Sequence, residues 1–423
     1  MPTLLETLSA RGMVHDATPD LGTRLGLGPV TAYAGFDPTA DSLGVGSLMP
    51  VMGLAWLQRL GGRPLVVIGG GTGMIGDPSG KRAERQILDP DTVQANAAAI
   101  QSQLARFLEF GGGPTGAAMV NNADWLAPIA LLDFLRDTGK HFTVNYMLQK
   151  ESVKSRMDAG ISFTEFSYML VQAYDFAHLA AAERCELQLG GSDQWGNITA
   201  GIELAARRDG RKLHGLVMPL LTTASGAKFG KTETGNIWLD PSKTSPYAFH
   251  QYWLQTSDAD VERLLRFMTF LDLDEISEVV GRHTANPGDR GAQRRLADDV
   301  TLRVHGASAV EQVNAAARIL FGGSDVRAAD AATLAVVAGQ IVTVPAVPGE
   351  LDGDGLPLAD ALIRTGLAAS KSDARRGLES GGYTVNGAVA DGSRRVLSGD
   401  VLPGGLVLLR KGKKNWAALQ FPS

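Results

Sequence analysis

Cysteine is nearly missing from this sequence, which holds a single one, Cys185, among 423 residues. One cysteine cannot form a disulfide within the chain, and it cannot supply a cysteine-ligated metal cluster. No apolar run reaches the ~18 residues of a membrane-spanning helix. The start, MPTLLETLSARGMVHD, has no basic residues followed by an apolar stretch, so a secretory signal is not expected. We therefore expect a cytoplasmic protein without a disulfide, a membrane span or a protein metal site.

Net charge is also small, at −5, but it is unevenly distributed. From Leu356 to the end, ten Lys and Arg face five Asp and Glu, so this segment carries +5 and the preceding 355 residues carry −10. A basic segment on an acidic body indicates a polyanionic partner for that segment. The hydrophobic content of 44% is enough for a core, and the length suggests about two to four domains.

Apolar strands alternate with helical segments in the first half of the chain. We expect strands, some of them running into turns, over residues 31–36, 64–70, 119–125, 187–197 and 215–223. Between them, the spacing of apolar residues predicts helices over 43–60 and 92–110 and a mainly helical stretch over 128–180. Such alternation is typical of an α/β domain with a parallel sheet.

The second half has a different pattern. The pattern over residues 245–321 is charged and predicts helices, and AVPGELDGDGLP (346–357) is the best candidate for a linker. The last segment predicts helices over 357–366 and 370–380, then strands around 383–387 and 405–419. This order indicates a small α+β module at the basic end of the chain.

The sequence GGGTGMIGDPSGKRAER (69–85) follows an apolar strand and contains the G-x-G-x-x-G spacing of dinucleotide-binding turns. However, an Asp-Pro pair interrupts the helix that should follow, and no strand ends in an acid about 20 residues later. A P-loop also fails, because the glycine spacing before Lys81 is one residue short and Arg82 replaces Ser or Thr. Two interpretations stay open: a plain glycine turn, or a nucleotide or amino-acid contact through Asp77, Lys81 and Arg85.

Three hydrogen-bonding residues, Tyr168, Gln172 and Asp175, share one face of a predicted helix in SYMLVQAYDF. Polar side chains on an otherwise apolar helix are costly unless they are paired. A polar ligand would pair them, and so would an internal polar network.

Two further glycine-rich stretches are GGSDQWGN (190–197) and AKFGKTETG (227–235). Lys228 and Lys231 of the second stretch suit a phosphate clamp. Two solvated loop charges would give the same pattern, so the spacing alone does not decide between them.

Six stretches, taken together and in this order, closely resemble the bacterial tyrosyl-tRNA synthetases, a class I family. They are YAGFDPTADSL, GGGTGMIGDPSGKRAER, TEFSYMLVQAYDF, GGSDQWGNITAG, TTASGAKFGKTETG and the basic SKSDARRGLESGGYTVNG. Each stretch is long, so chance agreement is negligible. The resemblance covers nearly the full length and is weakest over 322–350.

This resemblance implies an enzyme that makes tyrosyl-adenylate from L-tyrosine and ATP and then transfers the tyrosyl group to tRNA(Tyr). It also implies a homodimer, Mg²⁺ that arrives with ATP, and no tightly bound cofactor. The implied parts are a Rossmann-like catalytic domain with a helical insertion (1–225), a mobile KFGKT loop with its connection (226–245), an α-helical tRNA-contacting domain (246–322), a linker (323–355) and an S4-type RNA-binding domain (356–423).

The resemblance also assigns site residues. The tyrosine phenol is matched by Tyr33 and Asp175, the α-ammonium by Asp77, Tyr168 and Gln172, and other pocket positions by Gln188 and Gln194. The ATP positions are Gly35, Asp37, Thr39, Gly46, Ser47, Gly191, Asp193 and Lys231. The cations that face the leaving pyrophosphate are Lys228, Lys231, Lys81 and Arg85, and those that face tRNA are Lys371, Arg375, Arg376, Arg394 and Arg395.

One motif departs from the family. Its His-x-Gly-His sequence reads Gly44-Val45-Gly46-Ser47 here, so both histidines, which bind ATP phosphate in the family, are absent. Losing one transition-state donor typically costs about 10²–10³ in rate, so we expect near-normal tyrosine binding and slow activation. The alternative is a synthetase-like tyrosine- or RNA-binding protein with lost or weakened adenylation. A third interpretation, a nicotinamide-dependent oxidoreductase, is supported by the glycine spacing alone. The intact KFGKT loop favours a working enzyme, because a pure binder needs no pyrophosphate clamp.

Overall fold

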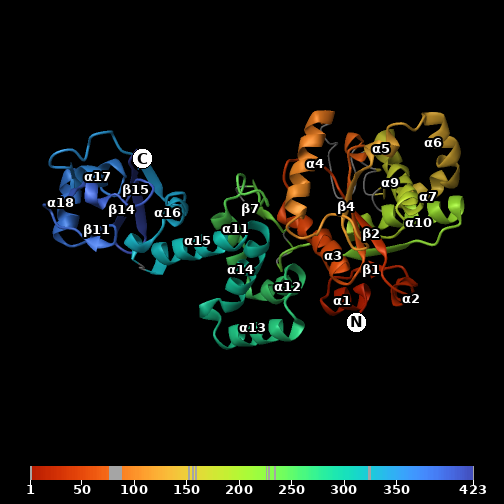
Figure 1. Ribbon diagram of the computed structural model, residues 1–423, viewed down its shortest axis with the longest axis horizontal. Helices are drawn as coiled ribbons and strands as arrows, with labels where there is room; N and C mark the ends of the chain where they lie inside the picture. The colour runs from red at the N-terminus through yellow and green to blue at the C-terminus, as the bar shows by residue number, and fades with distance from the viewer. Residues whose placement is uncertain are drawn as a thin grey trace. The chain divides into compact units, whose positions relative to one another are not determined.

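The computed structural model of this chain describes residues 2–75, 88–150, 153–154, 157, 160–224, 226, 229–232, 235–322 and 325–422 (Figure 1). The contacts divide the chain into two units, Met1–Val304 and His305–Ser423. Each unit has its own hydrophobic core.

The first unit is built on a six-stranded sheet in the order β1-β6-β5-β2-β3-β4. The five strands from β6 to β4 run parallel, and β1 pairs with β6 in the antiparallel direction. The bounds are β1 (Asp16–Ala17), β2 (Thr31–Phe36), β3 (Arg63–Ile68), β4 (Ala118–Asn121), β5 (Cys185–Gly191) and β6 (His214–Met218). These strands confirm the predicted Rossmann-like parallel sheet.

Helices cover both faces of this sheet, which explains why its strands are apolar on both sides. Alternate residues of β2 enter different cores: Ala32 and Ala34 lie in the cluster that includes α3 and α4, and Tyr33 lies in the cluster that includes α9 and α10. The bounds of the four helices are α3 (Leu48–Arg59), α4 (Pro90–Leu104), α9 (Phe163–Ala182) and α10 (Trp195–Asp209).

The strand order reverses its direction between β2 and β5, because the chain moves outward from β2 through β3 and β4 and then returns to the other side of β2. Ligands of open α/β sheets bind outside the carboxyl ends of the strands at such a point. Tyr33 of β2 lies opposite Gln188 of β5 in this register. The topology therefore brings together two residues that are far apart in the sequence.

The remaining helices of the first unit are short elements around the sheet and a helical group after the KFGKT stretch. They are α1 (Leu4–Ala10), α2 (Leu21–Gly26), α5 (Ala123–Leu126), α6 (Leu131–Asp137), α7 (Val144–Leu148), α11 (Pro246–Leu254), α12 (Asp258–Met268), α13 (Leu273–Ala285) and α14 (Gly291–His305). Residues of the helical group, such as Phe249, Trp253 and Leu264, belong to the same core as α3. The predicted helical segment over 246–322 is helical, but its first part shares a core with the catalytic sheet.

The second unit combines helices with a five-stranded sheet in the order β12-β11-β14-β15-β9. Its strands are β9 (Val342–Pro345), β11 (Tyr383–Val385), β12 (Ala388–Val389), β14 (Leu406–Lys411) and β15 (Asn415–Gln420), with a separate pair β10 (Leu356–Pro357) and β13 (Arg395–Val396). Its helices are α15 (Ala307–Ala317), α16 (Ala331–Ala338), α17 (Leu358–Arg364) and α18 (Lys371–Glu379). The predicted small α+β module is confirmed.

The boundary of this module differs from the prediction. We expected a linker over 323–355, but α16 occupies 331–338 and β9 pairs in parallel with β15. The expected linker is therefore wrong for this stretch. Its signal is weak because β9 is a four-residue strand with half-exposed and exposed residues, so it shows neither an apolar run nor a clear alternation.

Candidate active site

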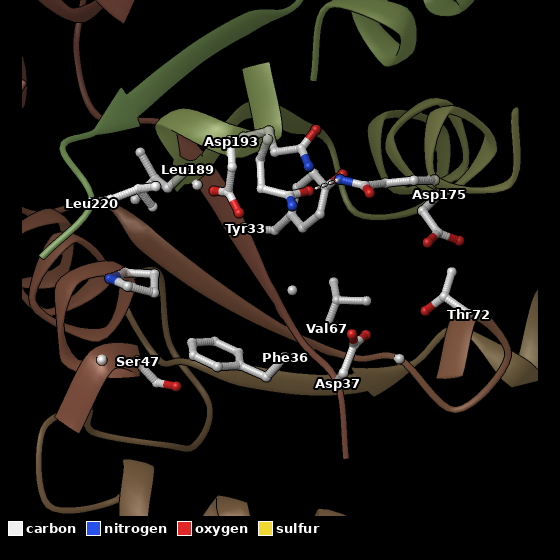
Figure 2. Close-up of a pocket in the computed structure, with 18 of the residues that line it drawn as sticks. Tyr33, Phe36, Asp37, Ser47, Val67, Thr72, Asp175, Leu189, Asp193 and Leu220 are labelled. Carbon is white, nitrogen blue, oxygen red and sulfur yellow. Dashed lines mark hydrogen bonds between the residues drawn. The ribbon is translucent and has the colours of Figure 1, made fainter. Parts of the chain in front are cut away.

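A cavity of about 640 Å³ opens at the carboxyl ends of the parallel strands, at the reversal of strand order. Six of the seven residues predicted to contact tyrosine line it, namely Tyr33, Tyr168, Gln172, Asp175, Gln188 and Gln194. The seventh, Asp77, lies outside the described residues. Figure 2 shows Asp175 and Thr72 at one end of the cavity and Ser47 and Leu220 at the other.

The carboxylate of Asp175 forms the closed end of the cavity and is only 3% exposed. Its two oxygens accept hydrogen bonds from Asn122 Nδ2 at 2.9 Å and from Trp125 Nε1 at 2.7 Å. Burial raises the pKa of Asp175 to about 7, although the two hydrogen bonds pull the pKa down. Near neutral pH this group can therefore be an ionised carboxylate, which could accept more hydrogen bonds than the two it has.

Asn122 holds this carboxylate in place, and both the amide group and the carbonyl oxygen of its side chain are hydrogen-bonded. Its second amide proton reaches Thr72 Oγ1 at 2.9 Å, and its carbonyl oxygen accepts from the backbone N–H of Gly71 at 2.7 Å. The side chain is 1% exposed. Sequence reasoning missed Asn122 and Trp125. The available signal was their place directly after β4, where the carboxyl end of a parallel strand meets the same edge as β2 and β5.

Two buried polar atoms in the cavity have no hydrogen-bond partner among the described residues: the hydroxyl of Tyr33 and the side-chain carbonyl of Gln188. Both residues are at most 3% exposed. Burial, together with the charge of Asp175, raises the pKa of Tyr33, so its hydroxyl keeps its proton. An unpaired buried polar group costs about 1–3 kcal/mol. These atoms therefore point to a polar ligand and not to a closed internal network.

Polar side chains of α9 and α10 form the middle of the cavity. Gln172 Nε2 donates to Gln194 Oε1 at 3.3 Å, and Asn197 Nδ2 donates to the same oxygen at 3.2 Å. Tyr168 is 5% exposed and lies one helical turn from Gln172 on α9. The predicted shared face of Tyr168, Gln172 and Asp175 is confirmed, since all three line the cavity.

The open end carries small and acidic residues. Of the predicted ATP positions, Gly35, Asp37, Gly46, Ser47 and Asp193 line the cavity, whereas Thr39, Gly191 and Lys231 are not part of its lining. A Cβ atom on Gly191 would lie 2.6 Å from Asp193 Oδ1, so this glycine serves local packing. A Cβ atom on Gly46 would meet no atom within 4 Å, so the backbone there faces open space.

The altered motif forms a short 3-10 turn, Val45–Ser47, that leads into α3. Gly44 has φ −88° and ψ 163°, a conformation open to any residue. Its backbone neighbours pair with a second segment, since Val45 N–H donates to Ile237 O at 3.0 Å and Leu239 N–H donates to Leu43 O at 2.9 Å. The fold therefore does not require glycine at the first position of the motif.

Two residues of the KFGKT stretch, Phe229 and Gly230, are held against the rest of the first unit. Phe229 is buried, and Gly230 N–H donates to the Tyr252 hydroxyl at 2.8 Å. Lys231 follows in β7 (Lys231–Thr232), which pairs with β8 (Gly235–Asn236), and its side chain is exposed. The other three predicted cations, Lys228, Lys81 and Arg85, lie outside the described residues.

The five basic residues predicted to face tRNA differ in their surroundings. Arg394 pairs with the buried carboxylate of Asp400 at 2.5 Å, and Arg395 donates to the carbonyls of Asp354 and Gly355 at 2.6 and 2.7 Å. Lys371 pairs with Asp360 at 2.8 Å on the surface. Arg375 and Arg376 are exposed on α18. Their exposed guanidinium groups are therefore better placed for phosphate than those of Arg394 and Arg395.

Two negative findings concern the described part of the chain. It contains no helix long and apolar enough to cross a membrane. Within the same ranges, no group of three or more His, Cys, Asp or Glu residues could hold a metal ion.

Known proteins are similar to this chain over nearly its full length. The family model of class I tRNA synthetases (W and Y) matches residues 27–322, and the tyrosine–tRNA ligase SYY-like C-terminal domain matches residues 339–419. The tyrosine–tRNA ligase of Anaeromyxobacter dehalogenans strain 2CP-1 is 59% identical over 99% of this chain and 100% of the relative. That of Roseiflexus castenholzii is 50% identical over 100% of both chains. The C-terminally truncated mitochondrial tyrosyl-tRNA synthetase of Aspergillus nidulans superposes with a TM-score of 0.69 at 32% identity, covering 76% of this chain and 95% of that chain.

Proposed function

This chain belongs to the class I tyrosyl-tRNA synthetases, and we propose here how the residues of its cavity divide the two substrates of that reaction between them. The activity itself is that of a tyrosine–tRNA ligase, which activates tyrosine with ATP and charges tRNA. Full-length relatives of this identity give no support to the alternative of a chain that has lost adenylation. The glycine spacing of 69–85 likewise belongs to this family and not to a nicotinamide enzyme.

The phenol of the substrate occupies the closed end of the cavity. Its hydroxyl accepts a hydrogen bond from Tyr33 and donates one to the Asp175 carboxylate, so each side of the hydroxyl meets its complement. The unpaired Tyr33 hydroxyl beside a buried acceptor is the observation that supports this placement. Phenylalanine would leave both groups unpaired. Tyrosyl-tRNA synthetases are already known to reject phenylalanine by about 10⁵, and the figure is taken from that family.

The α-ammonium of the substrate lies in the middle of the cavity, against Tyr168 and Gln172. A cation needs acceptors, and the hydroxyl and amide oxygens of these side chains supply them. Asp77 is assigned to the same group by the family pattern. With both ends of the amino acid held, the carboxylate of tyrosine is directed toward the open end.

Activation then requires no general base, because the tyrosine carboxylate is already the nucleophile. It attacks the α-phosphorus of ATP, a new C–O–P linkage forms, and the bond to pyrophosphate breaks. Mg²⁺ enters with ATP as part of the substrate. Lys231, with Lys228, Lys81 and Arg85, neutralises the charge that develops on the leaving pyrophosphate, so catalysis is positioning plus electrostatics. The product serves protein synthesis, and the proposed location is therefore the cytoplasm.

ATP approaches the backbone at Gly46, and this placement can be tested with one methyl group. In Gly46→Ala, the new methyl would project into the open end of the cavity, where a Cβ has no neighbour within 4 Å. We expect KM for ATP in tyrosine-dependent ATP–pyrophosphate exchange to rise about 10- to 100-fold, with the Kd for tyrosine unchanged. The matched control is Gly281→Ala, an exposed glycine of α13 whose Cβ also meets nothing. Equal KM values for the two variants would contradict the placement.

A homodimer is proposed through an exposed apolar surface on the helical insertion. Leu131, Leu132, Val144 and Phe163, from α6, α7 and the start of α9, are all at least 61% exposed. All four lie within residues 131–163, and exposed apolar surface that gathers in one part of a protein marks interaction sites. Sedimentation of the full chain should give the mass of two 44.6 kDa chains, and Leu132→Asp should shift the equilibrium to single chains. A monomer at micromolar concentration would contradict the proposal.

The C-terminal unit is proposed to bind tRNA phosphate through Arg375 and Arg376. Replacing both by glutamate should raise KM for tRNA in aminoacylation and reduce the salt dependence of binding by about one log-log unit per residue. Tyrosine-dependent exchange, which needs no tRNA, should stay unchanged and serves as the internal control. A loss of both activities would show a folding defect and not a lost phosphate contact.

A further inference from the structure

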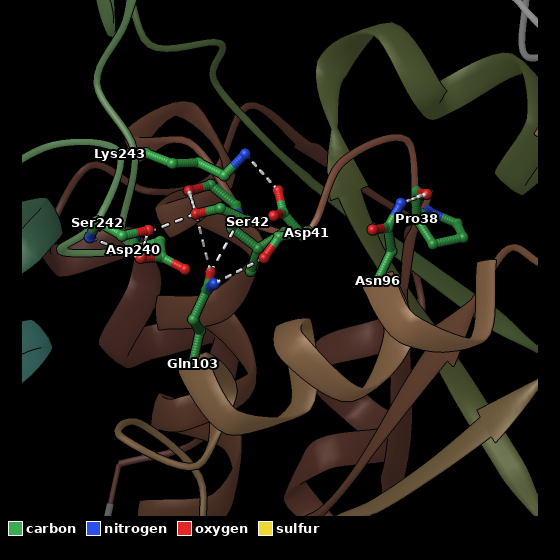
Figure 3. Close-up of polar contacts among 9 residues, drawn as sticks. Pro38, Asp41, Ser42, Asn96, Gln103, Asp240, Ser242 and Lys243 are labelled. Carbon is green, nitrogen blue, oxygen red and sulfur yellow. Dashed lines mark hydrogen bonds and ion pairs between the residues drawn. The ribbon is translucent and has the colours of Figure 1, made fainter. Parts of the chain in front are cut away.

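Two amide side chains of α4 hold the loop that joins β2 to α3, and neither residue lines the cavity (Figure 3). Asn96 Nδ2 donates to Pro38 O at 2.8 Å. Gln103, two helical turns further along the same face, accepts from Leu43 N–H through Oε1 at 2.9 Å and donates from Nε2 to Asp41 O at 3.3 Å. The loop is therefore held near both of its ends from one helix.

A second segment, residues 239–243, is attached to the same loop. Leu239 N–H donates to Leu43 O at 2.9 Å, and Asp240 N–H donates to Ser42 Oγ at 3.1 Å. This segment directly follows the β7–β8 hairpin that carries Lys231. An ion pair between Lys243 and Asp41 closes the arrangement. Figure 3 shows that the Ser42 hydroxyl contacts both Gln103 and Asp240.

The peptide groups of Leu43 are thus fixed on both sides, the N–H by Gln103 and the carbonyl by Leu239. Leu43 stands three residues before Gly46, where the backbone faces the open end of the cavity. In this chain the Ser47 hydroxyl is the motif's one polar side chain, and the N–H groups of Val45 and Ser47 already donate to Ile237 O and Gly44 O. The backbone donor that the motif offers to phosphate is therefore the Gly46 N–H. Backbone amides have no rotatable side chain to compensate for a shifted loop.

We infer that Gln103 is a positioning residue for tyrosyl-adenylate formation, which acts through the backbone of Leu43 on the amide at Gly46 and on the segment after the Lys231 hairpin. This inference rests on the proposed placement of ATP at Gly46. It concerns only the nucleotide end, because Asp175, at the proposed place of the tyrosine phenol, is held by different partners, Asn122 and Trp125. A substitution at Gln103 should therefore change the kinetic parameters for ATP and leave the affinity for tyrosine unchanged.

The test compares Gln103→Met with Gln101→Met. Methionine matches glutamine in length and helix propensity but makes neither hydrogen bond. Gln101 is exposed on the same helix two residues earlier, which makes it the matched control. We expect kcat/KM for ATP in pyrophosphate exchange to fall about 10- to 100-fold in Gln103→Met, as for other misplacements remote from the chemistry. The Kd for tyrosine, measured by equilibrium dialysis, should match that of Gln101→Met.

A second variant keeps the inference testable if Gln103→Met does not fold. Ser42→Ala removes the acceptor of Asp240 N–H and the hydroxyl that donates to Leu43 O at 3.0 Å and to Gln103 Oε1 at 3.4 Å. It leaves the bond from Leu43 N–H to Gln103, so we expect kcat/KM for ATP to fall less than in Gln103→Met. Tyrosine and ATP parameters that fall together, or ATP parameters equal to those of Gln101→Met, would overturn the inference. If Gly46→Ala raises KM for ATP but Gln103→Met does not, only the role of Gln103 fails. If Gly46→Ala has no effect, the placement of ATP fails first.

Discussion

Replacing Asp175 by asparagine should remove most of the preference for tyrosine over phenylalanine. The carboxylate offers two acceptors to the N–H groups of Asn122 and Trp125 and a third site to the substrate hydroxyl. An amide would turn its NH₂ toward one of these donors and leave a buried clash of like groups. We expect kcat/KM for tyrosine to fall about 10³-fold, while that for phenylalanine changes little, because phenylalanine never used the carboxylate.

The measurement is pyrophosphate exchange with tyrosine and with phenylalanine as alternative substrates. Asp137→Asn is the control, because Asp137 is an exposed carboxylate paired with Arg136 on the surface. A variant that keeps its selectivity at lower overall rate would contradict the proposed role, since it would show that Asp175 acts on both substrates alike.

The raised pKa of Asp175 gives the same proposal a pH signature. With a pKa of about 7 in the free enzyme, the acceptor form is lost below neutrality, so the Kd for tyrosine should rise toward about tenfold per pH unit below pH 7 and be flat above pH 8. Stability changes in the opposite direction. Because the folded pKa lies above the unfolded value of 3.8, the folded chain binds the extra proton between these values, and this group's contribution to stability falls as pH rises from about 4 to 7.

The sequence periodicity predicted the residues of one wall of the cavity. The residues of the other wall could not be predicted, because they meet through hydrogen bonds between distant parts of the sequence. Tyr168, Gln172 and Asp175 lie within two turns of one helix, so a repeat of about 3.6 residues is enough to group them. Asn122 and Trp125 contact Asp175 across 53 and 50 residues of sequence. No local pattern encodes such a pairing, and only the closing of the parallel sheet brings these residues to one edge.

The same limit explains the errors in the C-terminal unit. The sequence around β9 predicts a linker because the partner strand, β15, lies about 75 residues later, and a four-residue strand has no local pattern that indicates this pairing. Arg375 and Arg394 look equivalent in sequence, since each belongs to an arginine pair. Their difference arises from Asp400, a buried carboxylate that engages Arg394 and stabilises the fold around it.

Placing histidine at both altered motif positions, Gly44→His with Ser47→His, should raise the rate of tyrosine activation. The conformation of Gly44 admits a side chain, and a Cβ there would meet Ile237 O at an ordinary 3.5 Å. Ser47 already lines the cavity. A donor made available only to the transition state is worth about 10²–10³ in rate, so we expect kcat for exchange to rise about 100-fold with the Kd for tyrosine unchanged.

The two single variants decide how that gain is divided, because groups that act on one phosphate chain do not contribute additively. Gly281→His on exposed α13 controls for the added imidazole itself. If the double variant gains nothing, the Gly46 amide and the cations of the KFGKT loop already stabilise the transition-state charge. The hydrogen bonds of Gln103 and Leu239 to the Leu43 backbone then become the more important part of the ATP site. If the rate rises as expected, the fold can still hold both histidines of the family motif, and their absence is what slows activation in this chain.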